Sequence, residues 1–259
     1  MDKTTLINYL NDYLRIKDFS LEMDDSRNGL QVDNSNTEIR RIWYAVDAST
    51  YIFDLAIKEQ VDMLIVHHGI FWAFNYVITE RNYERISKLI KNDIALYACH
   101  LPLDAHPEVW NNIGITQAFI NIFWLKNYKL ENFDNYHGVF IWYWLKFEEQ
   151  IHISTIQSIF AQQMGFEKKL YNFGKKEFIN SVAIVSWWWG WQAKEALKDW
   201  YDLLITGESS HGHMLMAKEM KQSILLGWHR ETEKIWVKLL SHHLNKEFGL
   251  ETVFLDEKY

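Results

Sequence analysis

Histidine and carboxylate side chains follow four predicted apolar strands of this sequence. In chain order they are His67 and His68; His100, Asp104 and His106; Glu208 and His211; and His229 and Glu233. Neutral imidazole and carboxylate groups are ligands that suit Zn²⁺, Mn²⁺, Fe²⁺, Co²⁺ and Ni²⁺. Because ligand sites of an open parallel sheet lie beyond the carboxyl ends of its strands, we expect these groups to gather at one sheet edge. The sequence therefore predicts a metal site.

The adjacent histidines His67 and His68 fit such a site in one of two ways. Successive side chains of a strand point to opposite faces, so both reach one ion only if the chain turns there. Gly69 follows them and permits a turn. Alternatively, each histidine serves a different ion of a pair. For a His-His motif taken alone, a hydrogen-bonded or surface pair without metal is the more common interpretation.

His229 and Glu233 are four residues apart, which places both on one face of a predicted helix. A carboxylate can bridge two cations, so Asp104 and Glu233 are candidate bridges in a site with two ions about 3.5–4 Å apart. The simpler interpretation of a His–Glu pair on a helix is a solvated side-chain pair. The motif at 242–243 has no carboxylate pattern near it, and we assign it to that simpler class.

Apolar strands and amphipathic helices alternate along most of the chain, which favours two α/β lobes with mixed, mostly parallel sheets. Strands are predicted at 40–49, 62–68, 94–100, 139–147, 179–186, 202–208, 222–229 and 252–255. Helices are predicted near the N-terminus and at 50–60, 84–93, 154–164, 192–200, 209–220 and 231–248, with another beginning near 106. Residues 126–138 are polar and predicted to be a loop, which sets a lobe boundary near residue 125.

Composition narrows the class of protein. The chain has 259 residues, 48% of them hydrophobic, which is enough for one large domain or two smaller ones. A net charge of −7 argues against a general nucleic-acid binder. One cysteine excludes an internal disulfide, and no apolar run is long enough to span a membrane. We therefore expect a soluble cytoplasmic protein.

Several segments appear together in an order that identifies a family. They are SRNGLQVDN (26–34), AVDAS (45–49), LIVHHGIFW (64–72), YACHLPLDAH (97–106), ITGESSH (205–211) and HRETE (229–233). With these motifs the chain resembles the GTP cyclohydrolase 1 type 2 homologs, also called the Ngg-interacting-factor-three-like family. The resemblance extends over nearly the whole sequence.

The resemblance implies a dinuclear metal centre in each subunit. Its metal ligands would be His67, His68, Asp104, His229 and Glu233. His100 would lie close by, either behind the ligands or facing a substrate, and His211 would line the same cavity. Either histidine would serve as a proton carrier. The family's subunits form a toroidal homohexamer built from dimers, and its lobes interleave. The lobes would then comprise 1–125 with 228–259, and 126–227.

These features predict a metal-dependent hydrolase that acts on a nucleotide-like or phosphoester substrate. The ions would be two per subunit, of Zn, Fe, Mn, Co or Ni. The alternative is a non-enzymatic ring that binds or delivers metal or contacts another protein. A nucleic-acid-binding ring is the weakest alternative because the net charge is −7.

Tryptophan occupies several positions where the family usually carries glycine. The segment SWWWGWQ (186–192) follows a predicted strand, and similar departures occur near Trp43, Trp110, Trp142, Trp228 and Trp236. Glycine serves where φ is positive or where backbones approach closely, so indoles there would be strained. Either the loops of this lineage adapted to aromatic residues, or the chain differs from the natural molecule. The second interpretation predicts positive φ at several of these tryptophans. A stacking platform for a base is a third use of 186–192.

Overall fold

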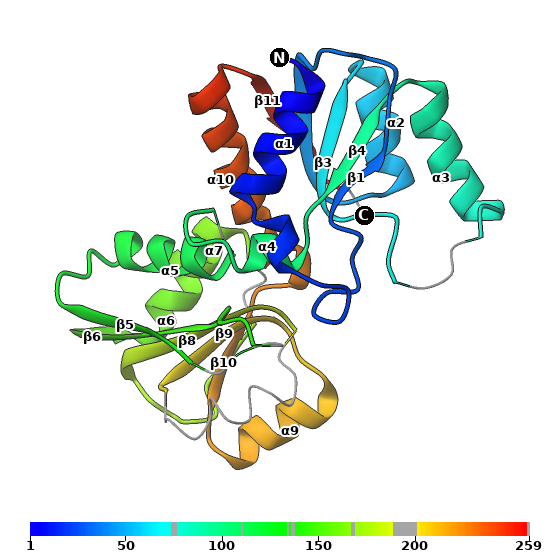
Figure 1. Cartoon of the computed structure of the whole chain (residues 1–259). Helices are drawn as coiled ribbons and strands as arrows, with labels where there is room; N and C mark the ends of the chain where they lie inside the picture. The colour runs from blue at the N-terminus through cyan, green and yellow to red at the C-terminus, as the bar shows by residue number, and fades with distance from the viewer. Residues whose placement is uncertain are drawn as a thin grey trace. The chain divides into compact units, whose positions relative to one another are not determined.

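The computed structural model describes residues 1–73, 77–109, 111–133, 135, 138–166, 169–188 and 201–257. The chain divides into two compact units, Met1–Val109 with Trp236–Tyr259 and Trp110–Ile235 (Figure 1). Both ends of the chain therefore belong to the first unit, and the second unit is an insertion. None of the described helices has the length and apolar character needed to cross a membrane.

The first unit is built on a five-stranded sheet in the order β1-β4-β3-β2-β11. Its strands are β1 (Gly29–Val32), β2 (Arg41–Asp47), β3 (Met63–His68), β4 (Ala95–Ala98) and β11 (Glu251–Phe254). Its helices are α1 (Lys3–Tyr13), η1 (Ile16–Asp18), α2 (Thr50–Lys58), α3 (Glu80–Lys91), α4 (Leu101–Asp104) and most of α10 (His229–Phe248). Four strands run parallel, and β1 is antiparallel to β4.

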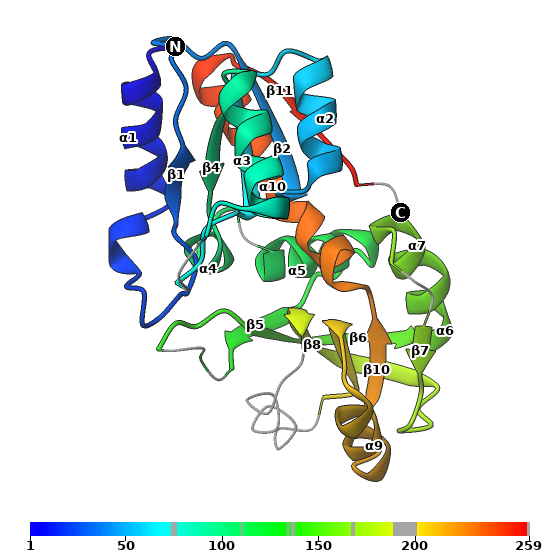
Figure 2. The same cartoon turned by 90° about the vertical axis from the view of Figure 1, so that its right-hand side faces the viewer.

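The two faces of this sheet follow the alternation of side chains along β3. Met63 and Ile65 pack in a core with α1 and α10, whereas Leu64 and Val66 pack in a second core with α2 and α3. The two pairs of helices lie on opposite sides of the sheet (Figure 2). Because both faces are covered, β3 is a nearly continuous apolar run, as expected of a parallel strand.

The second unit is built on a six-stranded mixed sheet in the order β5-β6-β8-β9-β10-β7. Its strands are β5 (Tyr128–Asn132), β6 (Tyr143–His152), β7 (Lys169–Tyr171), β8 (Phe178–Trp188), β9 (Leu203–Glu208) and β10 (Ser223–Leu226). Its helices are α5 (Asn111–Ile122), α6 (Ile153–Thr155), the π-helical turn η2 (Ile156–Phe160), α7 (Ala161–Met164) and α9 (His211–Glu219). Helices α5 to α7 cover one face of the sheet, and α9 lies on the other (Figure 1).

The α/β class with mixed sheets is confirmed, and three strands were missed. Strand β5 falls in the polar segment predicted to be a loop, and β1 and β7 were not predicted. Each of the three pairs antiparallel at a sheet edge. Only the first sheet is mostly parallel, since β6 also pairs antiparallel with β8. Edge strands carry short, partly polar sequences, which explains why the apolar pattern did not show them.

The observed units differ from the predicted boundaries at 125 and 228. Helix α5 belongs to the second unit because Ile115, Phe119 and Ile120 pack in its core. The other boundary falls inside α10, after Ile235. Hydrophobic contact, and not the polar stretch after α5, sets the first division.

Three tryptophans have the backbone geometry expected of glycine. Trp187 has φ of 63°, Trp228 has φ of 67° and Trp124 has φ of 53°. Trp124 follows α5, and the Leu125 amide donates back to the Ile120 carbonyl, as in a helix end that usually carries glycine. Trp187 lies where the pairing of β8 with β9 shifts register, another position that favours glycine.

The remaining tryptophans of this group behave differently. Trp43, Trp142 and Trp236 are not among the described residues with positive φ. Instead, their indole N–H groups are buried and have no hydrogen-bond partner among the described residues. A buried indole usually finds a partner, so these three rings also fit their sites poorly. Trp110 and the residues 189–191 lie outside the described part of the chain, as does the predicted helix at 192–200.

Candidate metal centre

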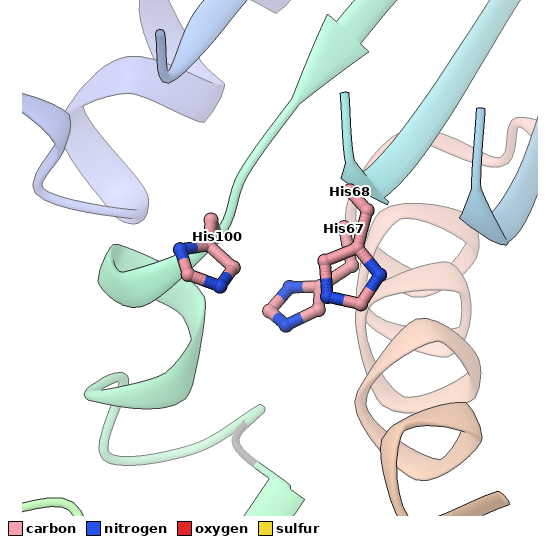
Figure 3. A group of neighbouring side chains, drawn as sticks. All are labelled: His67, His68 and His100. Carbon is pink, nitrogen blue, oxygen red and sulfur yellow. The ribbon is translucent and has the colours of Figure 1, made fainter. Parts of the chain in front are cut away.

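Two neighbouring strands deliver the histidines of the first unit. Strand β3 ends in His67 and His68, and β4 is followed by His100, the residue that precedes α4. Since β3 and β4 are parallel neighbours, their carboxyl ends meet at one edge of the sheet. The three imidazoles lie close together there (Figure 3). Asp104 closes the short helix α4 and is 2% exposed.

His67 is fully buried, and its ring is fixed from two sides. Its Nδ1 lies 2.9 Å from the Cys99 carbonyl oxygen, which can only accept, so Nδ1 carries the proton and Nε2 holds the lone pair. Its ring centroid lies 5.1 Å from that of Trp236, on the face of the sheet that α10 covers. Nε2 is thus the nitrogen through which His67 would bind a metal ion.

His68 is held by a carboxylate. Its Nδ1 lies 2.8 Å from Asp47 Oδ1, at the end of the neighbouring strand β2. A carboxylate on Nδ1 fixes the tautomer and makes Nε2 a stronger ligand. Although alternation directs His67 and His68 to opposite faces, their ring centroids are 4.6 Å apart. The end of β3 therefore brings both rings close together, an arrangement that fits one shared ion or a pair of neighbouring ions.

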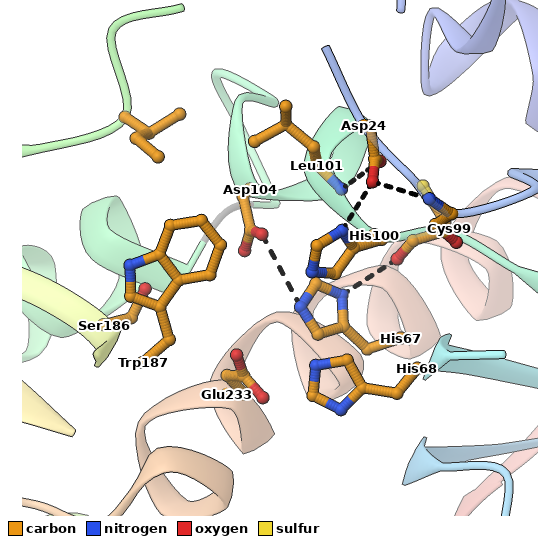
Figure 4. A network of polar contacts seen from close by, with 12 residues as sticks. Asp24, His67, His68, Cys99, His100, Leu101, Asp104, Ser186, Trp187 and Glu233 are labelled. Atoms are coloured by element: carbon orange, nitrogen blue, oxygen red, sulfur yellow. Dashed lines mark hydrogen bonds and ion pairs between the residues drawn. The ribbon is translucent and has the colours of Figure 1, made fainter. Parts of the chain in front are cut away.

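His100 is anchored by the buried carboxylate of Asp24. Its Nδ1 lies 2.8 Å from Asp24 Oδ1, and Asp24 also accepts the backbone N–H group of Leu101 (Figure 4). Asp24 further accepts the backbone N–H group of Ser26 and the side-chain amide of Asn28. Burial alone would raise the pKa of Asp24, but the hydrogen bonds from His100 and Asn28 hold it below its ordinary value. Asp24 is therefore an anion that fixes the orientation of His100.

The spacing of the donor atoms suits a metal ion. One ligand nitrogen from each of His67, His68 and His100 lies within 4.8 Å of the other two. Asp104 adds an oxygen, since its Oδ2 is 3.6 Å from His67 Nε2. That distance is too long for a hydrogen bond. It is close to the ~3.4 Å between two ligands of one tetrahedral ion with bonds of about 2.1 Å.

The second unit contributes the His–Glu pair predicted at the start of a helix. Helix α10 begins at His229, and His229 Nε2 lies 3.0 Å from Glu233 Oε1 one turn later. His229 Nδ1 lies 3.0 Å from Glu208 Oε1, at the end of β9. Glu233 is fully buried. This imidazole therefore also has a carboxylate on Nδ1, although its Nε2 already faces Glu233.

Backbones approach closely around this helix start. A side chain at Gly207 would place its Cβ 2.3 Å from the Trp187 carbonyl oxygen and 2.9 Å from the Cα of His229. Only glycine fits that position. Trp187 also donates its backbone N–H to Thr232 Oγ1. The backbone of Trp187 therefore contacts the segment that carries His229. The stacking platform predicted at 186–192 falls mostly on residues outside the described part of the chain and stays a prediction.

Two histidines predicted at strand ends do not join a cluster. His106 is buried, its Nε2 lies 2.9 Å from the Tyr13 carbonyl oxygen, and its Nδ1 accepts the amides of Glu108 and Val109. Burial lowers its pKa, as for a neutral structural histidine. His211 is exposed at the first residue of α9 and belongs to none of the potential ligand groups among the described residues.

Asp24 and Asp47 were missed as functional residues. Asp47 ends β2, so the rule that gathered residues at strand ends could have found it. Asp24 lies in the loop before β1, where no periodicity marks it. Both were present in or beside the segments that carry the family resemblance, but neither was given a role. Cys99 is a buried core residue, and burial raises the pKa of its thiol.

The fold and the donor set define a class of protein, a two-unit α/β chain with a histidine-rich centre at the strand ends of one sheet. The chain belongs to the Duf34/NIF3 (NGG1p interacting factor 3) family, whose sequence model matches residues 1–259. It is 38% identical over 260 residues to a GTP cyclohydrolase 1 type 2 homolog of Pyrococcus horikoshii, covering 99% of this chain and 98% of the relative. A homolog of the same name from Archaeoglobus fulgidus is 35% identical over 256 residues, covering 99% and 98%.

Solved structures agree with this assignment. The protein ybgI, of unknown function, matches with a TM-score of 0.86 and 28% identity, covering 100% of this chain and 99% of that one. TTHA1606 from Thermus thermophilus matches with a TM-score of 0.83 and 34% identity over the same shares. Reduced HcgD from Methanocaldococcus jannaschii, at 23% identity and a TM-score of 0.79, covers 99% and 98% and shares the fold.

Proposed function

We propose that the chain binds two divalent transition-metal ions and hydrolyses a nucleotide-like or phosphoester substrate. The proposed ligands are His67, His68, Asp104, His229 and Glu233. One observation carries the metal assignment: His67 and His68 each have Nδ1 bound to an acceptor, which leaves Nε2 as the ligand nitrogen. The names of the relatives, GTP cyclohydrolase 1 type 2 homolog, favour a nucleotide as the substrate.

The donor set fits the ions proposed for it. Mixed imidazole and carboxylate ligands suit Zn, Fe, Mn, Co or Ni. When bound, a pair of such ions supplies hydroxide near neutral pH and polarises the bond to be cleaved. Asp104 and Glu233 are buried carboxylates of the kind that bridge two cations. The side chain of Trp236 covers one side of His67 and keeps water from it.

His100 is the proposed proton carrier. Because Asp24 holds its Nδ1, His100 can accept or donate a proton at Nε2 while its ring stays in place. His211 is the second candidate for this role and would act from the exposed end of α9.

The test is metal-dependent turnover on a panel of nucleotides and phosphoesters. A His67→Ala, Asp104→Ala double variant is expected to lose bound metal and all turnover. His242→Ala, which removes an exposed histidine of α10, is the matched control and is expected to act as the unsubstituted protein. Fully metallated protein that turns over no member of a broad panel would contradict the hydrolase. Metal transfer to an apo acceptor protein would then favour the metal-delivery function.

A further inference from the structure

A cavity of about 610 Å³ lies in the first unit. It is lined by Ile16, Phe19, Leu21, Ser26, Arg27, Asn28, Leu30, Gln31, Phe71 and Trp72. This volume is within the range of small-molecule sites, roughly 300–1,000 Å³. None of the lining residues is a proposed metal ligand, so the cavity and the proposed metal centre share no residue.

Two of its walls are shared with the histidine cluster. The Trp72 ring centroid lies 5.1 Å from that of His100 in an edge-to-face arrangement, and 6.3 Å from that of His68. Asn28 Oδ1 accepts the His100 backbone N–H at 2.7 Å. A molecule in the cavity is thus one residue away from the proposed proton carrier.

The cavity walls are held in place without a ligand. Gln31 Oε1 accepts the amides of Ile70 and Phe71, and its Nε2 donates to the carbonyls of Arg27 and Phe71. The Arg27 amide also donates to the Phe71 carbonyl. These bonds clamp the segment after β3 to the segment before β1. A cavity formed in advance in this way costs less ordering on binding.

The lining residues indicate the chemistry of the ligand. Phe19, Phe71 and Trp72 are half-buried aromatic side chains that offer faces to a planar ring. Among the residues that line the cavity in the described chain, Arg27 is the only charged one, and it is exposed. The nearby Asp24 carboxylate accepts hydrogen bonds from four donors. These bonds reduce its repulsion of an anion in the cavity.

We propose that this cavity binds the aromatic ring of a nucleotide-class anion, with the ring against Trp72 and Phe71 and the negative group at Arg27. This inference rests on the proposed function, since it assigns the substrate's ring to a place beside His100. It adds a specificity site that the metal ligands do not supply. Stacking selects a planar ring, and the guanidinium selects a phosphate.

Calorimetric titration of the metal-free protein tests the proposal without any contribution from metal. The probes are adenosine and guanosine 5′-monophosphate, the two matching nucleosides, and ribose 5-phosphate. A nucleotide is expected to bind saturably. The nucleoside should bind about tenfold more weakly because it lacks the phosphate. Ribose 5-phosphate should also bind about tenfold more weakly because it lacks the ring. Arg27→Gln should weaken nucleotide binding to the level of the nucleoside. Trp72→Leu should weaken both, and Trp72→Phe should restore most of the loss.

Arg81→Gln, which removes an exposed arginine of α3, is the matched control and should leave all affinities unchanged. Protein labelled with 5-fluorotryptophan, with Trp72→Phe to assign the resonance, should show the Trp72 signal shifting on titration. The proposal is overturned if neither nucleotide binds, or if Arg27→Gln and Trp72→Leu bind as the unsubstituted protein does.

The outcome is separable from that of the proposed function. Binding to the cavity without metal-dependent turnover would sustain the cavity and overturn the hydrolase. Conversely, turnover that is unchanged in Arg27→Gln and Trp72→Leu would sustain the hydrolase and overturn the cavity assignment.

Discussion

At the residue scale, the acceptor on each Nδ1 is what distinguishes this cluster from a chance group of histidines. A carbonyl holds His67, and carboxylates hold His68 and His100. Each of these contacts fixes a tautomer, so that Nε2 of His67 and His68 would bind metal and Nε2 of His100 would carry a proton. The residue types were visible in the sequence, but their anchors were not, because Asp24 and the Cys99 carbonyl are brought to the histidines only by folding.

The carboxylate on His68 gives the first residue-scale prediction. Asp47→Ala should lower metal affinity about 10–100-fold, because His68 loses the contact that orients it and makes it basic. Competition with a chelator of known affinity measures the change. The control is Asp54→Ala, which removes an exposed carboxylate of α2 that pairs with Lys88 of α3. Equal affinities in the two variants would show that the Asp47 contact does not support the site.

Cys99 gives a second prediction at this scale. The thiol is fully buried, and burial raises its pKa well above the ordinary value. It is therefore protonated at neutral pH and shielded from reagents. Labelling with a thiol-specific disulfide reagent at about pH 7–8 should be absent in the folded protein and stoichiometric in denaturant. Rapid labelling of the folded protein would mean that the core around β4 opens readily.

At the element scale, the strand ends explain how much of the site the sequence could predict. The strands that deliver His67, His68 and His100 are central and buried on both faces, so their apolar runs were evident. The His–Glu spacing indicated one helical face for His229 and Glu233, although the apolar pattern predicted a strand up to 229 and a helix only from 231. Strands β1, β5 and β7 were missed because edge strands need only one partner and a weak apolar pattern.

The tryptophans at turns give a prediction at the same scale. A bulky residue with positive φ costs roughly 1–2 kcal/mol. Trp228 has φ of 67° and is 52% exposed, so its ring recovers little of that cost by burial. Trp228→Gly should therefore raise the free energy of unfolding by up to ~1 kcal/mol. The gain is smaller than the strain because glycine adds conformational entropy to the unfolded chain. Thermal or denaturant unfolding measures the change.

Trp187→Gly should act in the same direction because its φ is 63°. The control is Trp144→Gly near the start of β6, where the strand pairs with both neighbours and glycine should destabilise the protein. Destabilisation by Trp187→Gly and Trp228→Gly would show that the loops have adapted to the indoles. Together with the buried, unpartnered indoles of Trp142 and Trp236 among the described residues, the positive φ values favour a chain that differs from the natural molecule.

At the scale of the whole molecule, the chain path links the two parts of the proposed ligand set. Helix α10 begins in the second unit with His229 and Glu233 and continues into the first unit, where Trp236 contacts His67. One continuous helix therefore carries the proposed C-terminal ligands and contacts a proposed N-terminal ligand. The polar stretch after α5 does not mark the division between the two units. The hydrophobic contacts of α5 place this helix in the second unit, and the sequence alone does not show those contacts.

The family resemblance gives a prediction about assembly. The protein in solution should have six times the chain mass of 31.1 kDa, as a homohexamer. Light scattering coupled to size exclusion measures the mass, with dilution as the check on stability. A monomer at all concentrations would contradict the toroidal assembly and leave the metal centre to be explained by one chain.

The metal content of the protein tests the central claim most directly. Protein stripped with a chelator, reloaded with Zn²⁺ or Mn²⁺ and freed of excess metal should carry two ions per chain by elemental analysis. His68→Ala and Glu233→Ala should each carry fewer, whereas the exposed control His242→Ala should still carry two. Fewer than one ion per chain in the unsubstituted protein, or two ions in all four proteins, would contradict the assignment of this centre.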